Sequence, residues 1–238
     1  MRMTSALLLL ATVAFAAAPL FTPGFTGYDP ASFPVVIDRP AIQPAGYAFA
    51  IWGLIYAWLI LHAGVSLLRH SDDTAWHRPR PALLAALLLG TIWLAIAANY
   101  PITATLVIVL MAALAVTAFL QTTTAQHRWL LSAPIAIFAG WLTAAAAVSV
   151  GVLMAGYGWL SNTATALTLI TLVVVLGITV QSRKPAMPVY GATVTWALIG
   201  VFAANWSGNL PQVAYPAVLA ALIVAAATAA LGLRALRP

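Results

Sequence analysis

Residues 81–127 read PALLAALLLGTIWLAIAANYPITATLVIVLMAALAVTAFLQTTTAQH, a run of 47 residues between Arg80 and Arg128 without an acidic or basic (Asp, Glu, Lys or Arg) side chain. A helix that crosses the hydrocarbon core of a bilayer needs about 20 apolar residues. The run is therefore long enough for two such helices, and Asn99-Tyr100-Pro101 near its middle supplies polar and helix-breaking groups for a turn. The stretch predicts a pair of membrane-spanning helices.

The rest of the chain follows the same pattern. Its 238 residues are 63% hydrophobic and 6% charged, whereas about a quarter of the residues of a soluble domain are charged. A water-soluble fold is excluded. Further uncharged runs occupy 40–68, 129–182 and 185–233. We expect an all-α integral membrane protein with about eight transmembrane helices, at roughly 3–20, 46–69, 81–99, 102–123, 129–153, 162–182, 187–206 and 213–233.

The basic residues indicate how these helices are oriented. If the N-terminus is cytoplasmic, the outer side receives only Arg39, and the inner side receives Arg2, Arg69, Arg78, Arg80, Arg128, Arg183, Lys184, Arg234 and Arg237. We therefore expect both termini to be cytoplasmic. This placement explains the net charge of +6 without nucleic acid. Residues 2–18 also resemble a cleavable signal peptide, and cleavage would leave the topology of the remaining chain unchanged.

Few ionisable groups are predicted inside the membrane. The chain has no Glu and no Cys, its four aspartates (Asp29, Asp38, Asp72 and Asp73) fall in loops, and its one lysine, Lys184, follows a helix. Ion-coupled transporters and proton pumps place carboxylates in their spans, so that mechanism has no residues here. His62 is a weak candidate for an axial ligand of a porphyrin metal, and a hydrogen bond to a neighbouring helix is favoured. No other metal site is expected.

Tryptophan is abundant, with nine residues. Trp76, Trp129, Trp159 and Trp206 fall at helix ends, where an aromatic belt explains them. Five others lie deeper along the predicted helices: Trp52, Trp58, Trp93, Trp141 and Trp196. Trp52 and Tyr56 share one helix face because they are four residues apart. Such rings suit the wall of a pocket for a flat, apolar ligand, and the alternative is that they fill gaps between Ala-rich helices.

A long apolar segment, 21–45, connects the first two helices on the outer side. It carries Phe25, Tyr28 and Phe33 among five prolines, and it is too long and too apolar for a plain linker. We interpret it as a lid over the outer mouth of the bundle. The alternative is a loop that dips into the membrane interface.

One motif resembles a known family. Residues 44–56, PAGYAFAIWGLIY, are similar to the signature of the TspO/MBR family of tryptophan-rich sensory proteins, which includes the mitochondrial translocator protein. Trp93, Pro134 and Gly140-Trp141 also resemble family positions. The resemblance covers about residues 1–155. The later helices, with Tyr190 and residues 196–200, look like the extended bacterial branch, which implies a bacterial cytoplasmic (inner) membrane.

The resemblance implies a five-helix core over 1–155 with 21–45 as its lid, and three additional transmembrane helices over 156–238. It also implies a pocket for a tetrapyrrole such as porphyrin or haem, or for a sterol. The chain departs from the family at Gly90 and Ser149, where members often carry asparagine, so polar recognition of propionates is reduced. The candidate ligand-binding residues are Tyr47, Trp52, Tyr56, Trp93, Asn99, Trp141, Ser149 and Trp196, with Phe25, Tyr28 and Phe33 in the lid.

The leading hypothesis is a membrane-embedded binding and sensory-regulatory protein with a Trp-rich pocket for a planar hydrophobic ligand: a tetrapyrrole, a sterol or a carotenoid. The first alternative is an accessory subunit of a larger membrane assembly, in which the small residues of 217–230 contact a partner. A tetrapyrrole-degrading enzyme is less favoured, because no nucleophile, acid–base pair or metal site is evident. A passive transporter is also less favoured, although eight helices can enclose a path. Expected partners are membrane lipid, a hydrophobic small molecule, and a second copy or a larger complex, but not nucleic acid.

Overall fold

The computed structural model describes residues 1–22 and 27–235. The long helices are α1 (Arg2–Phe21), α2 (Ile51–Arg69), α4 (Arg80–Ala97), α5 (Pro101–Gln121), α6 (Arg128–Gly156), α7 (Asn162–Arg183), α8 (Val189–Ser207) and α9 (Pro211–Ala235). Three short elements join them: the 3-10 helices η1 (Pro30–Ser32) and η2 (Gly46–Ala50), and α3 (Thr74–His77).

The predicted all-α membrane fold is confirmed. Among the described residues, eight helices are long and apolar enough to cross a bilayer, and they match the eight predicted spans within a few residues at most ends. The second predicted span is not a single α-helix, because its first five residues form the 3-10 helix η2 and α2 begins only at Ile51. The third is preceded by α3, whose first turn is capped by the Asp73 carboxylate accepting from the Ala75 N–H.

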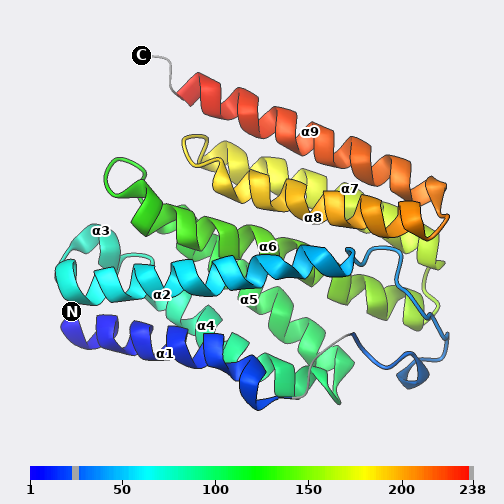
Figure 1. The fold of residues 1–238 in the computed structure, drawn as a ribbon, viewed down its shortest axis with the longest axis horizontal. Helices are drawn as coiled ribbons and strands as arrows, with labels where there is room; N and C mark the ends of the chain where they lie inside the picture. Colours follow the sequence, from blue (N-terminus) through cyan, green and yellow to red (C-terminus); the bar gives the residue numbers. More distant parts are fainter. Residues whose placement is uncertain (23–26, 236–238) are drawn as a thin grey trace.

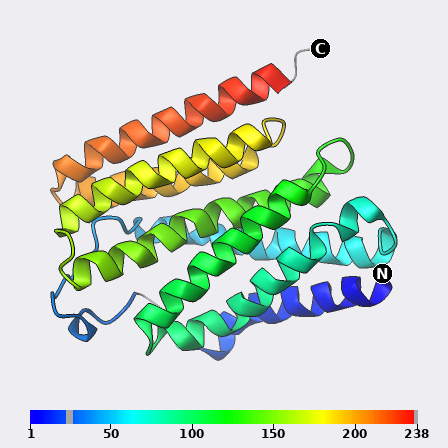
Figure 2. The same ribbon diagram turned by 180° about the vertical axis from the view of Figure 1, so that it is seen from behind.

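Five helices form a closed ring. Helix α1 packs against α2 and α4, α4 against α5, α5 against α6, and α6 returns to α2. In Figure 1, α1 and α2 lie in front of α4 and α5, and in Figure 2, the view from behind, α4 and α5 lie in front. Helix α6 buries a larger share of its residues than the other spanning helices. It does so because it also contacts α7 and α8 on its far side.

The last three helices pack on one another and join the ring through α6. At Gly140 α6 and α8 approach closely, because an added Cβ there would lie 2.8 Å from the Tyr190 carbonyl oxygen. Helix α9 lies at the edge of the molecule (Figure 1) and packs on α7 and α8. Its small residues Ala217, Ala220 and Ala221 are buried. Ala226, Ala229 and Ala230 of the same stretch are exposed, so the contact of 217–230 with a partner subunit stays a prediction. A division of the chain near residue 155 stays a prediction.

Basic residues gather at one end of the bundle. Both termini, the α2–α4 connection, the start of α6 and the α7–α8 turn lie at the left in Figure 1, and segment 27–45 lies at the opposite end. We call the first end the basic end: it carries Arg2, Arg69, Arg78, Arg80, Arg128, Arg183, Lys184 and Arg234. Arg237 lies outside the described residues. An even number of spans places both termini on one side, and which side is cytoplasmic stays a prediction.

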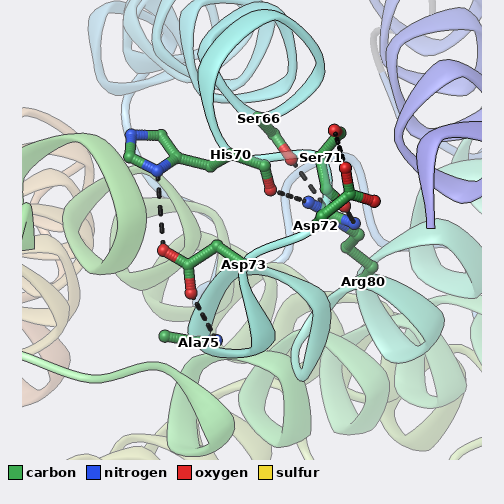
Figure 3. A network of polar contacts seen from close by, with 7 residues as sticks. All are labelled: Ser66, His70, Ser71, Asp72, Asp73, Ala75 and Arg80. Carbon is green, nitrogen blue, oxygen red and sulfur yellow. Dashed lines mark hydrogen bonds and ion pairs between the residues drawn. The ribbon is translucent and has the colours of Figure 1, made fainter.

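The α2–α4 connection at the basic end is held by Arg80 (Figure 3). This side chain is 1% exposed and donates to the Ser71 carbonyl at 2.8 Å, the His70 carbonyl at 2.5 Å and the Ser66 hydroxyl at 3.2 Å. A charged donor needs such partners when it is buried. Trp76 in the same connection is buried, stacked with His70 at 4.4 Å and with His62 at 5.2 Å. Its assignment to the aromatic belt is wrong, because its ring packs between helices.

Candidate ligand-binding site

Three of the predicted pocket residues meet in one cluster. The rings of Trp52 and Tyr56 stack at 5.3 Å on α2, as expected for residues four apart. Trp141 of α6 meets Trp52 edge-on at 6.2 Å, and Phe49 of η2 meets Trp141 at 5.5 Å. These rings form what we call the aromatic cluster, in the half of the membrane next to segment 27–45.

The interior of the helix ring behind this cluster is filled by Phe15 of α1. Its ring lies 5.8 Å from Trp52, 5.4 Å from Tyr56 and 5.6 Å from Phe138. A Cβ built at Gly90 would lie 2.5 Å from the Phe15 ring. The absence of a side chain at Gly90 therefore makes room for Phe15. The aromatic cluster does not line either of two cavities found among the described residues, which measure about 120 and 10 Å³.

Most of the deep tryptophans bond to backbone carbonyls of neighbouring elements. The indole N–H groups of Trp58, Trp93 and Trp196 donate to the carbonyls of Trp129 (2.9 Å), Ala104 (2.9 Å) and Ala48 (3.1 Å). Trp141 is different. It is 2% exposed, and its Nε1 has no hydrogen-bond partner among the described residues. An unsatisfied buried N–H costs about 1–3 kcal/mol, so this donor is available to an acceptor that enters the cluster.

Tyr47 and Trp196 form a second contact at the edge of the cluster. Their rings lie 5.7 Å apart, and they join η2 to α8. Tyr47 is 50% exposed and Trp196 is 37% exposed. Both rings therefore present an aromatic surface toward the surroundings of the bundle rather than toward its interior.

Segment 27–45 is anchored to the ring by a chain of hydroxyl groups. The Tyr28 hydroxyl lies 2.6 Å from the Ser149 Oγ on α6, which lies 3.3 Å from the Thr105 Oγ1 on α5. Burial raises the pKa of Tyr28, and the hydrogen bonds to Ser149 and Thr105 partly oppose that rise. Phe33 is buried against Gly156, where a Cβ would come within 2.6 Å of its ring. Phe25, the third predicted lid residue, lies outside the described residues.

The other half of the segment is held by the C-terminal helices. Arg39 donates to the Ala204 carbonyl, and its own carbonyl accepts from the Asn162 amide at 3.0 Å. The Ala41 N–H donates to Asn162 Oδ1 at 2.8 Å, and the Ala41 carbonyl accepts from Asn205 Nδ2 at 2.7 Å. Helices α7 and α8 therefore contact segment 27–45. Its role as a lid over the five-helix ring stays a prediction.

The remaining predicted residues lie apart from the cluster. Trp93 joins α4 to α5, and Asn99 is exposed in the α4–α5 turn. The favoured interpretation of His62 is confirmed, because its Nδ1 lies 2.8 Å from the Leu130 carbonyl on α6. Nothing in the described part of the chain groups three or more His, Cys, Asp or Glu residues around a metal-sized space.

Sequence reasoning missed Phe15, Phe49, Phe138 and Thr105. The two N-terminal phenylalanines carried a signal, since Phe15 lies in an apolar helix and Phe49 lies within the family-like motif. No pattern in the sequence states which rings face one another across helices.

One of the comparisons with known proteins identifies a family. The profile of the TSPO-like protein family matches residues 5–230, and neither the curated proteins nor the solved structures give a match. The match extends beyond residues 1–155, where the motifs lie. It begins in the first turn of α1, reaches all eight spanning helices and ends five residues before the end of α9. By its aromatic motif, its helix ring and this nearly full-length match, the chain belongs to the TSPO-like protein family.

Proposed function

We propose that this membrane protein binds a planar, hydrophobic ligand with an acidic or carbonyl group, of the tetrapyrrole class, at the aromatic cluster, and that binding serves a sensory or regulatory role. The observation that carries the proposal is the unpartnered indole N–H of Trp141. The macrocycle would stack on Trp52 and Tyr56, which are only half-buried, and its acceptor group would take the Trp141 proton donor.

Binding on this proposal requires the rings to rearrange. Phe15 occupies the space behind Trp52 and Tyr56, and a drug-sized ligand needs a site of about 300–1,000 Å³. A ligand would therefore displace Phe15, or enter as segment 27–45 lifts from Ser149 and Gly156. We expect slow association, because binding that requires a conformational change has a reduced on-rate.

The test uses the purified full-length protein in mild detergent and the absorbance of the ligand itself. Protoporphyrin IX carries two carboxylates, and an octaalkyl porphyrin has none. We expect Trp141→Phe to weaken protoporphyrin binding by about tenfold, the size expected for loss of a hydrogen bond to a charged acceptor, and to leave the octaalkyl porphyrin unaffected. Trp206→Phe is the matched control, since Trp206 is 56% exposed at the end of α8.

A second variant tests whether Phe15 occupies the space that the ligand needs. Phe15→Leu removes a ring from the interior, and we expect both porphyrins to bind more tightly to it. If Trp141→Phe and Trp206→Phe change saturable binding equally, the ligand binds outside the aromatic cluster. Absence of binding by the wild-type protein and by Phe15→Leu would refute the proposal.

We also propose that the basic end faces the cytoplasm in a bacterial inner membrane, which the positive-inside rule supports. The chain has no cysteine, so single cysteines can report the side. Ser182→Cys near the basic end and Ser207→Cys at the opposite end both replace exposed residues. A membrane-impermeant thiol reagent added to intact cells should label only the second variant, and labelling of only the first would reverse the orientation.

A further inference from the structure

A cavity at the basic end lies far along α6 from the aromatic cluster. It has a volume of about 120 Å³ and is lined by Arg128, Trp129, Ala186, Met187, Pro188 and Gly232. These residues come from the first turn of α6, the α7–α8 turn and the last turns of α9. At about 30 Å³ for each water in the liquid, the space equals roughly four waters, which is too small for a macrocycle and suits a short stretch of hydrocarbon chain.

The surroundings of this cavity are cationic. Arg128 lies in its lining, and the segments that form it also carry Arg183, Lys184 and Arg234. The aspartates lie elsewhere: two are in segment 27–45 at the opposite end, and Asp72 and Asp73 belong to the α2–α4 connection. The charged side chains on the elements that form the cavity are therefore all basic, and they attract an anion.

The guanidinium of Arg128 is available for such an anion. It lies 5.1 Å from the centre of the Trp129 ring, and Arg128 makes no ion pair or side-chain hydrogen bond with any other residue that the structure describes. Trp129 is 50% exposed at the depth where indoles meet lipid headgroups. A fork of guanidinium N–H donors fits a phosphate with two hydrogen bonds.

We infer that this cavity binds an anionic phospholipid, with its phosphate on Arg128 and an apolar part of the lipid between α6 and α9. Because the cavity wall is apolar, we expect a free phosphate to bind less well than a lipid. Because each basic side chain near a membrane surface favours anionic lipid, we expect a preference for an anionic headgroup. This inference is independent of the proposed tetrapyrrole site.

The test is native mass spectrometry of the delipidated full-length protein in detergent, supplied with equal amounts of phosphatidylglycerol and phosphatidylcholine. We expect the wild type to retain phosphatidylglycerol about tenfold more than phosphatidylcholine. Because both lipids carry a phosphate, Arg128→Gln should lower the retention of both. It should also reduce the preference for phosphatidylglycerol without abolishing it, since Arg183, Lys184 and Arg234 remain. Arg128→Lys should restore part of the retention because the charge remains without the fork. Arg69→Gln, an exposed cation of the same end, is the matched control and should retain the preference.

A further variant separates the apolar part from the charge. A Cβ at Gly232 would meet only the Pro185 carbonyl, at an ordinary 3.7 Å, so Gly232→Leu fills the cavity from α9 and leaves the cations in place. We expect it to lower retention of both lipids. Equal retention of the two lipids by the wild type, equal effects of Arg128→Gln and Arg69→Gln, or displacement of the lipid by millimolar inorganic phosphate would overturn the inference.

Discussion

Asn205 offers a direct test of how segment 27–45 is held. Its side chain is fully buried, and its Nδ2 donates to the Ala41 carbonyl at 2.7 Å and to the Val201 carbonyl at 2.8 Å. The second bond lies within α8. The first joins α8 to the segment, as does a longer contact of 3.5 Å between Asn205 Oδ1 and Arg39. Arg39 and Ala45 also donate to α8, at the carbonyls of Ala204 and Gly200.

We expect Asn205→Ala to favour release of the segment. The substitution leaves the Ala41 carbonyl without its side-chain donor, at a cost of about 1–3 kcal/mol. Since about 1.4 kcal/mol corresponds to a tenfold change in an equilibrium constant, the open population should increase roughly 5- to 150-fold. The Ala45 N–H, which donates to the Gly200 carbonyl at 2.9 Å, should then exchange with solvent faster by the same factor.

Amide hydrogen exchange followed by mass spectrometry measures this effect on peptides that cover 35–45. Ser207→Ala is the matched control, because Ser207 bonds only to carbonyls of its own helix near the same end. Exchange in 41–45 that stays within about twofold of wild type would refute the reasoning. A uniform increase along α8 would also refute it, because that outcome means that the helix itself unfolds.

Three further predictions concern stability in detergent. Gly140→Ala should lower the thermal unfolding midpoint, because its Cβ would meet the Tyr190 carbonyl at 2.8 Å. A Cβ at Gly53 meets nothing within 4 Å, so Gly53→Ala should raise the midpoint slightly, because the higher helix propensity of alanine adds about 0.5–1 kcal/mol to the unfolding free energy. Arg80→Gln should cost about 2–5 kcal/mol of unfolding free energy, measured by thermal or denaturant titration, because three acceptors in the α2–α4 connection lose their donor. Burial, and then the charge of Arg78, lower the pKa of Lys184 from 10.5 to about 8. Between these values the unfolded chain holds a proton that the folded chain lacks, so the unfolding free energy should increase as pH rises from about 8 to about 10.5, and Lys184→Met should remove that increase.

Each of these has a contrary outcome. Equal midpoints for Gly140→Ala and Gly53→Ala would mean that α6 and α8 can separate without cost. Wild-type stability of Arg80→Gln would show that water replaces the lost donors. Stability that falls over the stated pH window in the wild type, and equally in Lys184→Met, would assign the dependence to another group.

The positions of the spans could be predicted from the sequence for a local reason. A backbone in hydrocarbon must bond within its own helix, so length, hydropathy and the positions of a few charges suffice to place each span. The run 81–127 determined α4 and α5, including the turn at Asn99-Tyr100. Neighbouring residues on one helix, such as Trp52 and Tyr56, could also be paired from their spacing alone.

The contacts between helices needed the tertiary structure. Asn99 and Asn205 look alike in the sequence near helix ends, yet Asn99 is exposed and Asn205 is fully buried against Ala41. Trp76 and Trp129 both suit a membrane interface, and only Trp129 is exposed.

The sequence by itself thus determined that this chain crosses a membrane eight times and that its described basic residues, except Arg39, lie at one end, because those properties depend on each helix alone. Only the tertiary structure decided that Phe15 fills the ring behind Trp52, that Trp141 keeps a free N–H, and that α7 and α8 hold segment 27–45. The physical reason is that side-chain packing depends on the rotation and spacing of helices far apart in the chain, which apolar periodicity does not specify when nearly every face is apolar.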